Sequence, residues 1–128
     1  MNKMQALHSF WSSFGIPAFD ENTVPDENER ISRYGHAFPY LTYESSSDSF
    51  GNKVAQTSSL WYRTSSWAEI TQKEEQIADF IGRGGAMIAF DDGCIWIQKA
   101  SPWAQRMDDP NDEMIRRIVL NVTIEFLD

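Results

Sequence analysis

The sequence has few of the residues from which chemical sites are usually built. Its 128 residues include one cysteine, Cys94, and two histidines, His8 and His36. A single cysteine excludes an intrachain disulfide and a zinc site made of several thiolates. It also favours a reducing compartment, because stable disulfides are typical of secreted proteins.

Basic residues and long apolar runs are scarce as well. Eleven Lys and Arg stand against nineteen Asp and Glu, a formal net charge of −8. A protein that recognises a nucleic-acid sequence needs a basic surface, so this charge argues against that function. It is compatible with a protein past which nucleic acid slides without being held. No run approaches the length of a membrane span, and the first residues lack the apolar centre of a signal peptide. We therefore expect no membrane partner.

Aromatic residues, in contrast, are plentiful. Hydrophobic residues make up 41% of the chain and aromatic residues 13%, with five Trp and eight Phe. This content and length predict one packed domain over residues 1–128 rather than a disordered chain. Part of the aromatic surface can serve an interface, where Trp and Tyr are enriched.

The clearest pattern lies in residues 116–128, where apolar residues occupy every second position. This period of two is typical of a strand with one buried face. The residues predicted to face the core are Ile118, Leu120, Val122, Ile124 and Phe126.

Two segments have the period of amphipathic helices. The first carries Met4, Leu7, Trp11 and Phe14, spaced three, four and three apart, and stops at a glycine and a proline. This stripe is typical of a helix that lies on a sheet, although a partner-binding helix has the same pattern. The second segment begins at Ser66, where a capping box with Glu69 is expected. Its predicted apolar face consists of Trp67, Ile70, Ile77 and Ile81, and residues 82–85 end it.

Four further segments are predicted strands. Residues 38–44 and 53–63 indicate a long antiparallel hairpin whose tip is residues 45–52. Residues 86–90 and 94–99 indicate a second hairpin, with Gly93 where a positive φ is wanted. Residues 20–30 and 101–113 are predicted loops. The resulting fold class is α+β, an antiparallel or mixed β-sheet with two helices packed on one face.

No combination of residues indicates an active site. Neither histidine is paired with a nucleophile, and Cys94 has no cationic neighbour that would lower its pKa, so a buried apolar role is expected. Residues 82–85 follow a helix instead of preceding one, unlike a phosphate-binding loop. The acidic residues 108–113 lack the spacing of a calcium loop. We therefore predict no enzyme activity, no cofactor and no metal.

Several local phrases together resemble a known family. They are Phe-Pro-Tyr-Leu-Thr-Tyr-Glu at 38–44, Leu-Trp-Tyr-Arg-Thr-Ser-Ser-Trp at 60–67, Gly-Arg-Gly-Gly at 82–85, Pro-Trp-Ala-Gln-Arg-Met at 102–107 and Ile-Arg-Arg-Ile at 115–118. With the order of elements, they are similar to the tail terminator or head-to-tail joining proteins of phages and prophages. The resemblance covers nearly the whole chain but includes no strict functional motif.

The resemblance implies a structural subunit of a hexameric ring, assembled in the host cytoplasm and kept in the virion. Such a ring caps the tail tube, ends its polymerisation and joins it to the head connector. DNA passes through the hole without sequence-specific binding, which an acidic wall would assist. Two alternatives are another head-tail adaptor, such as a connector-completion protein, and a small enzyme. A deep pocket holding a carboxylate with a raised pKa would favour the enzyme.

Three aromatic residues are the candidate interface. They are Phe50 in the predicted hairpin tip, Trp61 and Trp103. Phe50 can anchor a neighbouring subunit or the tube, or it can fold back on its own sheet, and the sequence leaves both readings open.

Overall fold

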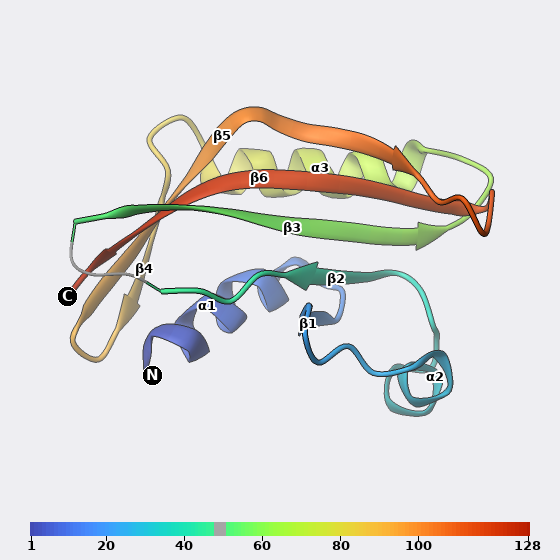
Figure 1. Cartoon of the computed structure of the whole chain (residues 1–128), viewed down its shortest axis with the longest axis horizontal. Coiled ribbons are helices and arrows are strands. Elements are labelled where there is room, and N and C mark those ends of the chain that lie inside the picture. Colours follow the sequence, from blue (N-terminus) through green and yellow to red (C-terminus); the bar gives the residue numbers. More distant parts are fainter. Residues whose placement is uncertain (48–50) are drawn as a thin grey trace.

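A computed structural model describes residues 1–47 and 51–128 and places them around one mixed sheet (Figure 1). The α+β class predicted from the sequence is confirmed. The elements, in chain order, are α1 (Lys3–Trp11), the 3-10 turn η1 (Ser12–Phe14), β1 (Ala18–Asp20), α2 (Glu27–Tyr34), β2 (Tyr40–Tyr43), β3 (Lys53–Arg63), α3 (Ala68–Ile81), β4 (Ala86–Phe90), β5 (Gly93–Asp108) and β6 (Ile115–Leu127).

The last strand lies at the centre of the sheet. The strand order is β1-β2-β3-β6-β5-β4, in which only the β1–β2 pair is parallel. β6 pairs with β3 on one side and with β5 on the other, and its predicted inward residues are all buried. The alternation in the sequence therefore identified both the strand and its register.

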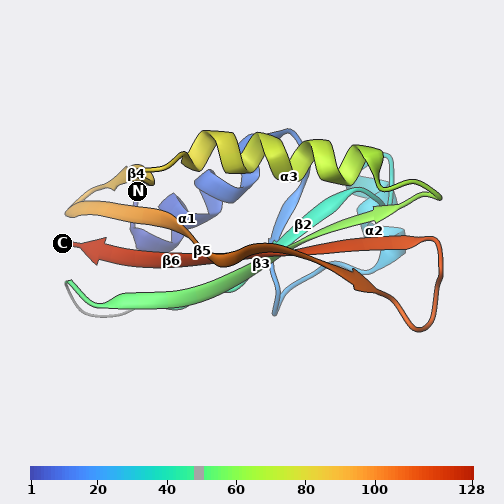
Figure 2. The same ribbon diagram turned by 90° about the horizontal axis from the view of Figure 1, so that it is seen from above.

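Helices α1 and α3 cover one face of the sheet, as Figure 2 shows. From α1 the core receives Leu7, Phe10 and Trp11, all at most 3% exposed. Burying a side chain of this size stabilises the fold by about 1.5–3 kcal/mol. Met4 was predicted on the buried stripe, but it lies in the first turn of the helix and is 37% exposed. From α3 the core receives the three predicted isoleucines, Ile70, Ile77 and Ile81.

The prediction of a loop over residues 20–30 is wrong, because α2 begins within it. The side chain of Asp26 caps this helix by accepting a hydrogen bond from the Glu29 amide at 2.8 Å. The helix ends at Gly35, whose φ of 83° is left-handed. Arg30 is its one buried residue and donates to the carbonyl oxygens of Pro25 and Ala37. Capping and these polar contacts hold a helix that has no apolar stripe, so periodicity missed it.

The prediction of a loop over residues 101–113 is also wrong as far as Asp108, because β5 continues to that residue. The pairing with β6 shifts register between Lys99 and Ala104. A bulge of this kind moves side chains out of strict alternation and hides the strand from a period-two search.

Two local predictions are corrected in detail. Trp67 is the N-cap of α3, and the Ser66 hydroxyl accepts from the Ala68 amide, so the expected capping box with Glu69 does not form. Gly93 does start the second strand of the predicted hairpin, but without a positive φ. Its need for glycine is steric, since a Cβ there would overlap the Leu127 carbonyl oxygen.

The first predicted hairpin is real but shorter than expected. β2 and β3 pair over four residues only, from Tyr40 opposite Trp61 to Tyr43 opposite Ser58. The predicted tip includes Phe50, which lies outside the described residues. None of the helices in residues 1–47 and 51–128 is long and apolar enough to span a membrane.

Candidate functional site

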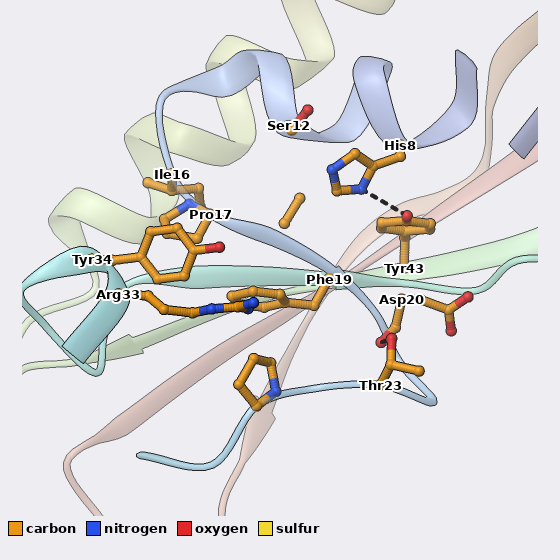
Figure 3. A pocket seen from close by; sticks show the side chains of 12 residues that line it. His8, Ser12, Ile16, Pro17, Phe19, Asp20, Thr23, Arg33, Tyr34 and Tyr43 are labelled. Atoms are coloured by element: carbon orange, nitrogen blue, oxygen red, sulfur yellow. Dashed lines mark hydrogen bonds between the residues drawn. The ribbon is translucent and has the colours of Figure 1, made fainter. Parts of the chain in front are cut away.

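A groove with a volume of about 490 Å³ lies beside the edge strand β1 (Figure 3). Five consecutive residues, 16–20, form its floor. His8 of α1 and Ser12 of η1 form one wall, and Arg33 and Tyr34 of α2 form another. Thr23, Pro25 and Tyr43 complete the lining.

The backbone of β1 has an amide and a carbonyl group, both of Ala18, that do not point toward β2. The Pro17 carbonyl accepts from the Leu41 amide at 2.8 Å, and the Glu21 amide donates to the Tyr43 carbonyl at 2.9 Å. These bonds direct the Pro17 carbonyl and the Glu21 amide, which flank β1, toward β2. Because the ladder of a strand alternates, the amide and carbonyl of Ala18 point away from β2, as in an unpaired sheet edge.

Side chains fix the walls of the groove. His8 Nδ1 and the Tyr43 hydroxyl lie 2.9 Å apart and form a hydrogen bond. Burial raises the pKa of Tyr43, with a smaller contribution from the charge of Asp20. On the other side, the rings of Phe19 and Tyr34 pack edge to face with centroids 5.7 Å apart. Helix α2, which the sequence did not reveal, therefore supplies one side of the site.

Asp20 is the carboxylate of the groove. It accepts from the Ser45 hydroxyl and from the Asn22 amide, and these hydrogen bonds, that of Ser45 first, hold its pKa below the ordinary value. The pKa values of Asp112 and Asp128 are lowered as well. The enzyme alternative called for a pocket carboxylate with a raised pKa, and Asp20 has the opposite shift.

No cluster of three or more His, Cys, Asp or Glu side chains suited to a metal ion occurs among the described residues. Cys94 was expected to be buried, yet it is a free thiol of intermediate exposure. The predicted role of this residue as a buried apolar side chain is therefore wrong in part.

The two described members of the predicted interface lie on opposite faces of the sheet. The Trp61 ring stacks on the Tyr40 ring, with centroids 6.0 Å apart. The Arg117 guanidinium lies over the Trp61 ring, 4.5 Å from the centroid of that ring. Trp103 lies on the helix-covered face, where its indole N–H donates to Glu74 of α3 at 2.6 Å. Both are half-buried. Neither lines the groove beside β1, and their predicted interface role stays a prediction.

A second edge is open in β5. β4 pairs with β5 only from Gly93 to Ile97, and the part from Ala104 to Asp108 pairs with β6 alone among the described residues. Most of this second part is exposed to solvent, including Gln105, Arg106 and Met107. We call residues 104–108 the open segment of β5, and Figure 1 shows it at the end of the sheet away from β4.

Arg106 on the open segment has no acidic partner among the residues that the structure describes. Its guanidinium lies over the Trp67 ring, 4.8 Å from the centroid, and makes one long contact of 3.5 Å with the Thr71 hydroxyl. None of the described carboxylates comes within 4.0 Å of it. This charge is therefore available to another molecule.

The groove escaped prediction because β1, which forms its floor, and α2, which forms one wall, were not predicted from the sequence. A weak signal was present in Asp26 followed three residues later by Glu29, with Gly35 beyond, the usual start and stop of a helix. A scan of protein-family models finds none that matches this sequence, and a search of curated proteins finds no similar chain.

Proposed function

We propose that this chain is a structural subunit of a phage or prophage tail. Six copies form a ring that caps the tail tube, ends its polymerisation and joins it to the head connector. The ring assembles in the host cytoplasm and stays at the tail-head junction of the virion. The family resemblance of the sequence motivates the proposal, and one feature of the fold supports it.

That feature is the part of the sheet formed by β1, β2, β3, β6 and the open segment of β5. Among the described residues, each of its two outer strands pairs on one side only. One row across the strands contains Ala18, Leu41, Leu60, Ile118 and Arg106. Its first member lies on the edge strand β1, where Ala18 lines the groove and is 6% exposed, and its last lies on the open segment of β5. An exposed edge is a template for another strand, and natural proteins usually cover it. Two different edges on one subunit suit head-to-tail assembly, which closes into a ring when the rotation fits.

The charge of the chain agrees with the expected path of DNA. With a net charge of −8, a ring of these subunits would repel phosphates and let a duplex slide instead of holding it. The adaptor alternative shares the ring and differs in its partner, so the partner has to be part of the test.

Native mass spectrometry of the purified protein, alone and with tail-tube protein, tests the proposal. A six-subunit species that binds the end of the tube is the expected result, and adding it to growing tubes should shorten them in electron micrographs. Binding to head connectors but not to tubes would assign the chain to the adaptor class. A stable dimer under every condition, tubes included, would rule out the ring.

A further inference from the structure

The two outer strands of this part of the sheet, β1 and the open segment of β5, run in directions that allow them to pair between two copies. β1 is parallel to β2, and the successive pairs β2–β3, β3–β6 and β6–β5 are antiparallel. β1 therefore runs opposite to β5 within one subunit. A second copy that extended the same sheet would bring its β1 to the open segment of β5 as an antiparallel neighbour.

We propose that the groove beside β1 receives the open segment of β5, Ala104–Asp108, from a neighbouring copy of this chain. The inference rests on the proposed self-assembly and names the two surfaces that meet. The occupant is an added strand, held by main-chain hydrogen bonds to the outward amide and carbonyl of Ala18. Strand addition of this kind is a common mode of recognition at sheet edges.

The side chains of the two surfaces are complementary in charge. Ala18 and Arg106 share a row of the sheet and so lie on the same face, and Asp20, two residues beyond Ala18, has the same orientation. Within one subunit Asp20 is bound by neutral groups, and Arg106 has no described carboxylate near it. Bringing the segment into the groove gives each charge an opposite partner.

The small size of each contact fits a closed ring. β1 is only three residues long, so a single junction offers few hydrogen bonds. In an open oligomer one end subunit leaves its groove empty and the other end subunit leaves its segment empty, whereas ring closure fills both at once. The closing contact forms within the assembly, at high effective concentration, and this favours the complete ring over intermediates.

Disulfide trapping in the full chain tests the pairing. In a Cys94→Ala background, Asp20→Cys is combined with Arg106→Cys, or, as the matched control, with Gln105→Cys. The two β5 positions are adjacent and both exposed, but their side chains point to opposite faces of the strand. A disulfide needs Cα atoms within about 7 Å and side chains directed at each other. Asp20→Cys alone carries one thiol and cannot link more than two chains.

Under mild oxidation, the Asp20→Cys, Arg106→Cys protein should give a ladder of cross-linked oligomers on a non-reducing gel. The Gln105→Cys control should give no ladder beyond random dimers. Equal ladders from both, or a ladder from neither, would overturn the pairing. A six-subunit ring without this cross-link would leave the proposed function in place and move the interface, whereas a cross-linked ladder that never closes would remove the ring and keep the pairing.

A peptide test on the unmodified protein guards against a variant that fails to fold. A synthetic peptide of residues 101–109 should lower the fraction of six-subunit species in native mass spectra, because it occupies the groove. A scrambled peptide of the same composition should not. Loss of assembly with both peptides, or with neither at high excess, would contradict a groove that accepts this segment.

Discussion

The two halves of β5 belong to one strand but have different surroundings. The first half, Gly93–Ile97, lies between β4 and β6, and its inward residues Ile95 and Ile97 are fully buried. The second half, Ala104–Asp108, keeps β6 but has no described neighbour on its other side, and four of its five residues are exposed. A register shift separates the halves.

The difference indicates that the two parts of β5 contribute differently to the stability of the fold. The first half contributes to the free energy of folding, because it removes apolar surface from water. The second half contributes little burial, and among the described residues its outer edge has no neighbouring strand and its Arg106 has no carboxylate partner. Variants in the two halves should therefore affect different measurements.

The largest contrast is expected between Ile97→Ala and Met107→Ala. Ile97 is fully buried opposite Ile124, so its truncation should lower the free energy of unfolding by about 2–5 kcal/mol. Met107 is 43% exposed, and its truncation should change stability by about 0.5 kcal/mol or less while weakening the six-subunit species. Urea unfolding followed by circular dichroism measures the first effect, and native mass spectrometry measures the second.

Equal losses of stability from Ile97→Ala and Met107→Ala would contradict the different roles of the two parts of β5. The same measurement extends to β6, where Leu120→Ala should be costly and Thr123→Ala should not, because Leu120 is fully buried and Thr123 points to the other face. Similar values for this pair would mean that the register of β6 is displaced by one residue.

A smaller effect is expected for Gly93→Ala, at the start of the closed half. A Cβ at this position overlaps the backbone of Leu127, so the end of β6 must shift, at a cost of about 1–3 kcal/mol. Gly84→Ala is the matched control, because Gly84 is exposed, has no positive φ and has open space around it. Thermal melts should separate the two. A Gly93→Ala protein as stable as the control would show that the β5–β6 junction is loose.

The elements that form the buried core could mostly be predicted from the sequence. The alternation in β6, the stripe of α1 and the isoleucines of α3 all follow from burial on one face, which leaves a strong period in the sequence. The same logic could not find α2, whose stability comes from Asp26 and Arg30 through hydrogen bonds, nor the open segment of β5, which lies beyond a bulge.

The candidate site was invisible for the same reason. Its groove lies beside the edge strand β1, and no spacing of side chains encodes an unpaired backbone amide. The predicted aromatic interface depended on residue type alone, so it could not foresee that Trp61 and Trp103 lie on opposite faces. Sequence patterns report what is buried within one chain, and they say little about surfaces that await a partner.

The smallest effect is expected at Asp20 of β1, the carboxylate of the groove that we propose receives the open segment of β5. The hydrogen bond from Ser45 is the main cause of its lowered pKa, so Ser45→Ala should raise the pKa of Asp20 toward the ordinary value of 3.8. A lowered pKa stabilises the folded state above pH 3.8, and that contribution is lost as the pH falls through the folded-state pKa. Because this carboxylate is largely solvated, the loss is screened and should be slight.

Nuclear magnetic resonance titration of the carboxyl carbon measures the pKa directly in the wild type and in Ser45→Ala. The stability of the two proteins should differ slightly at neutral pH and converge in acid, where both carboxyls are protonated. A wild-type value at or above 3.8, or one that Ser45→Ala does not move, would show that the Ser45 hydrogen bond does not lower the pKa of Asp20.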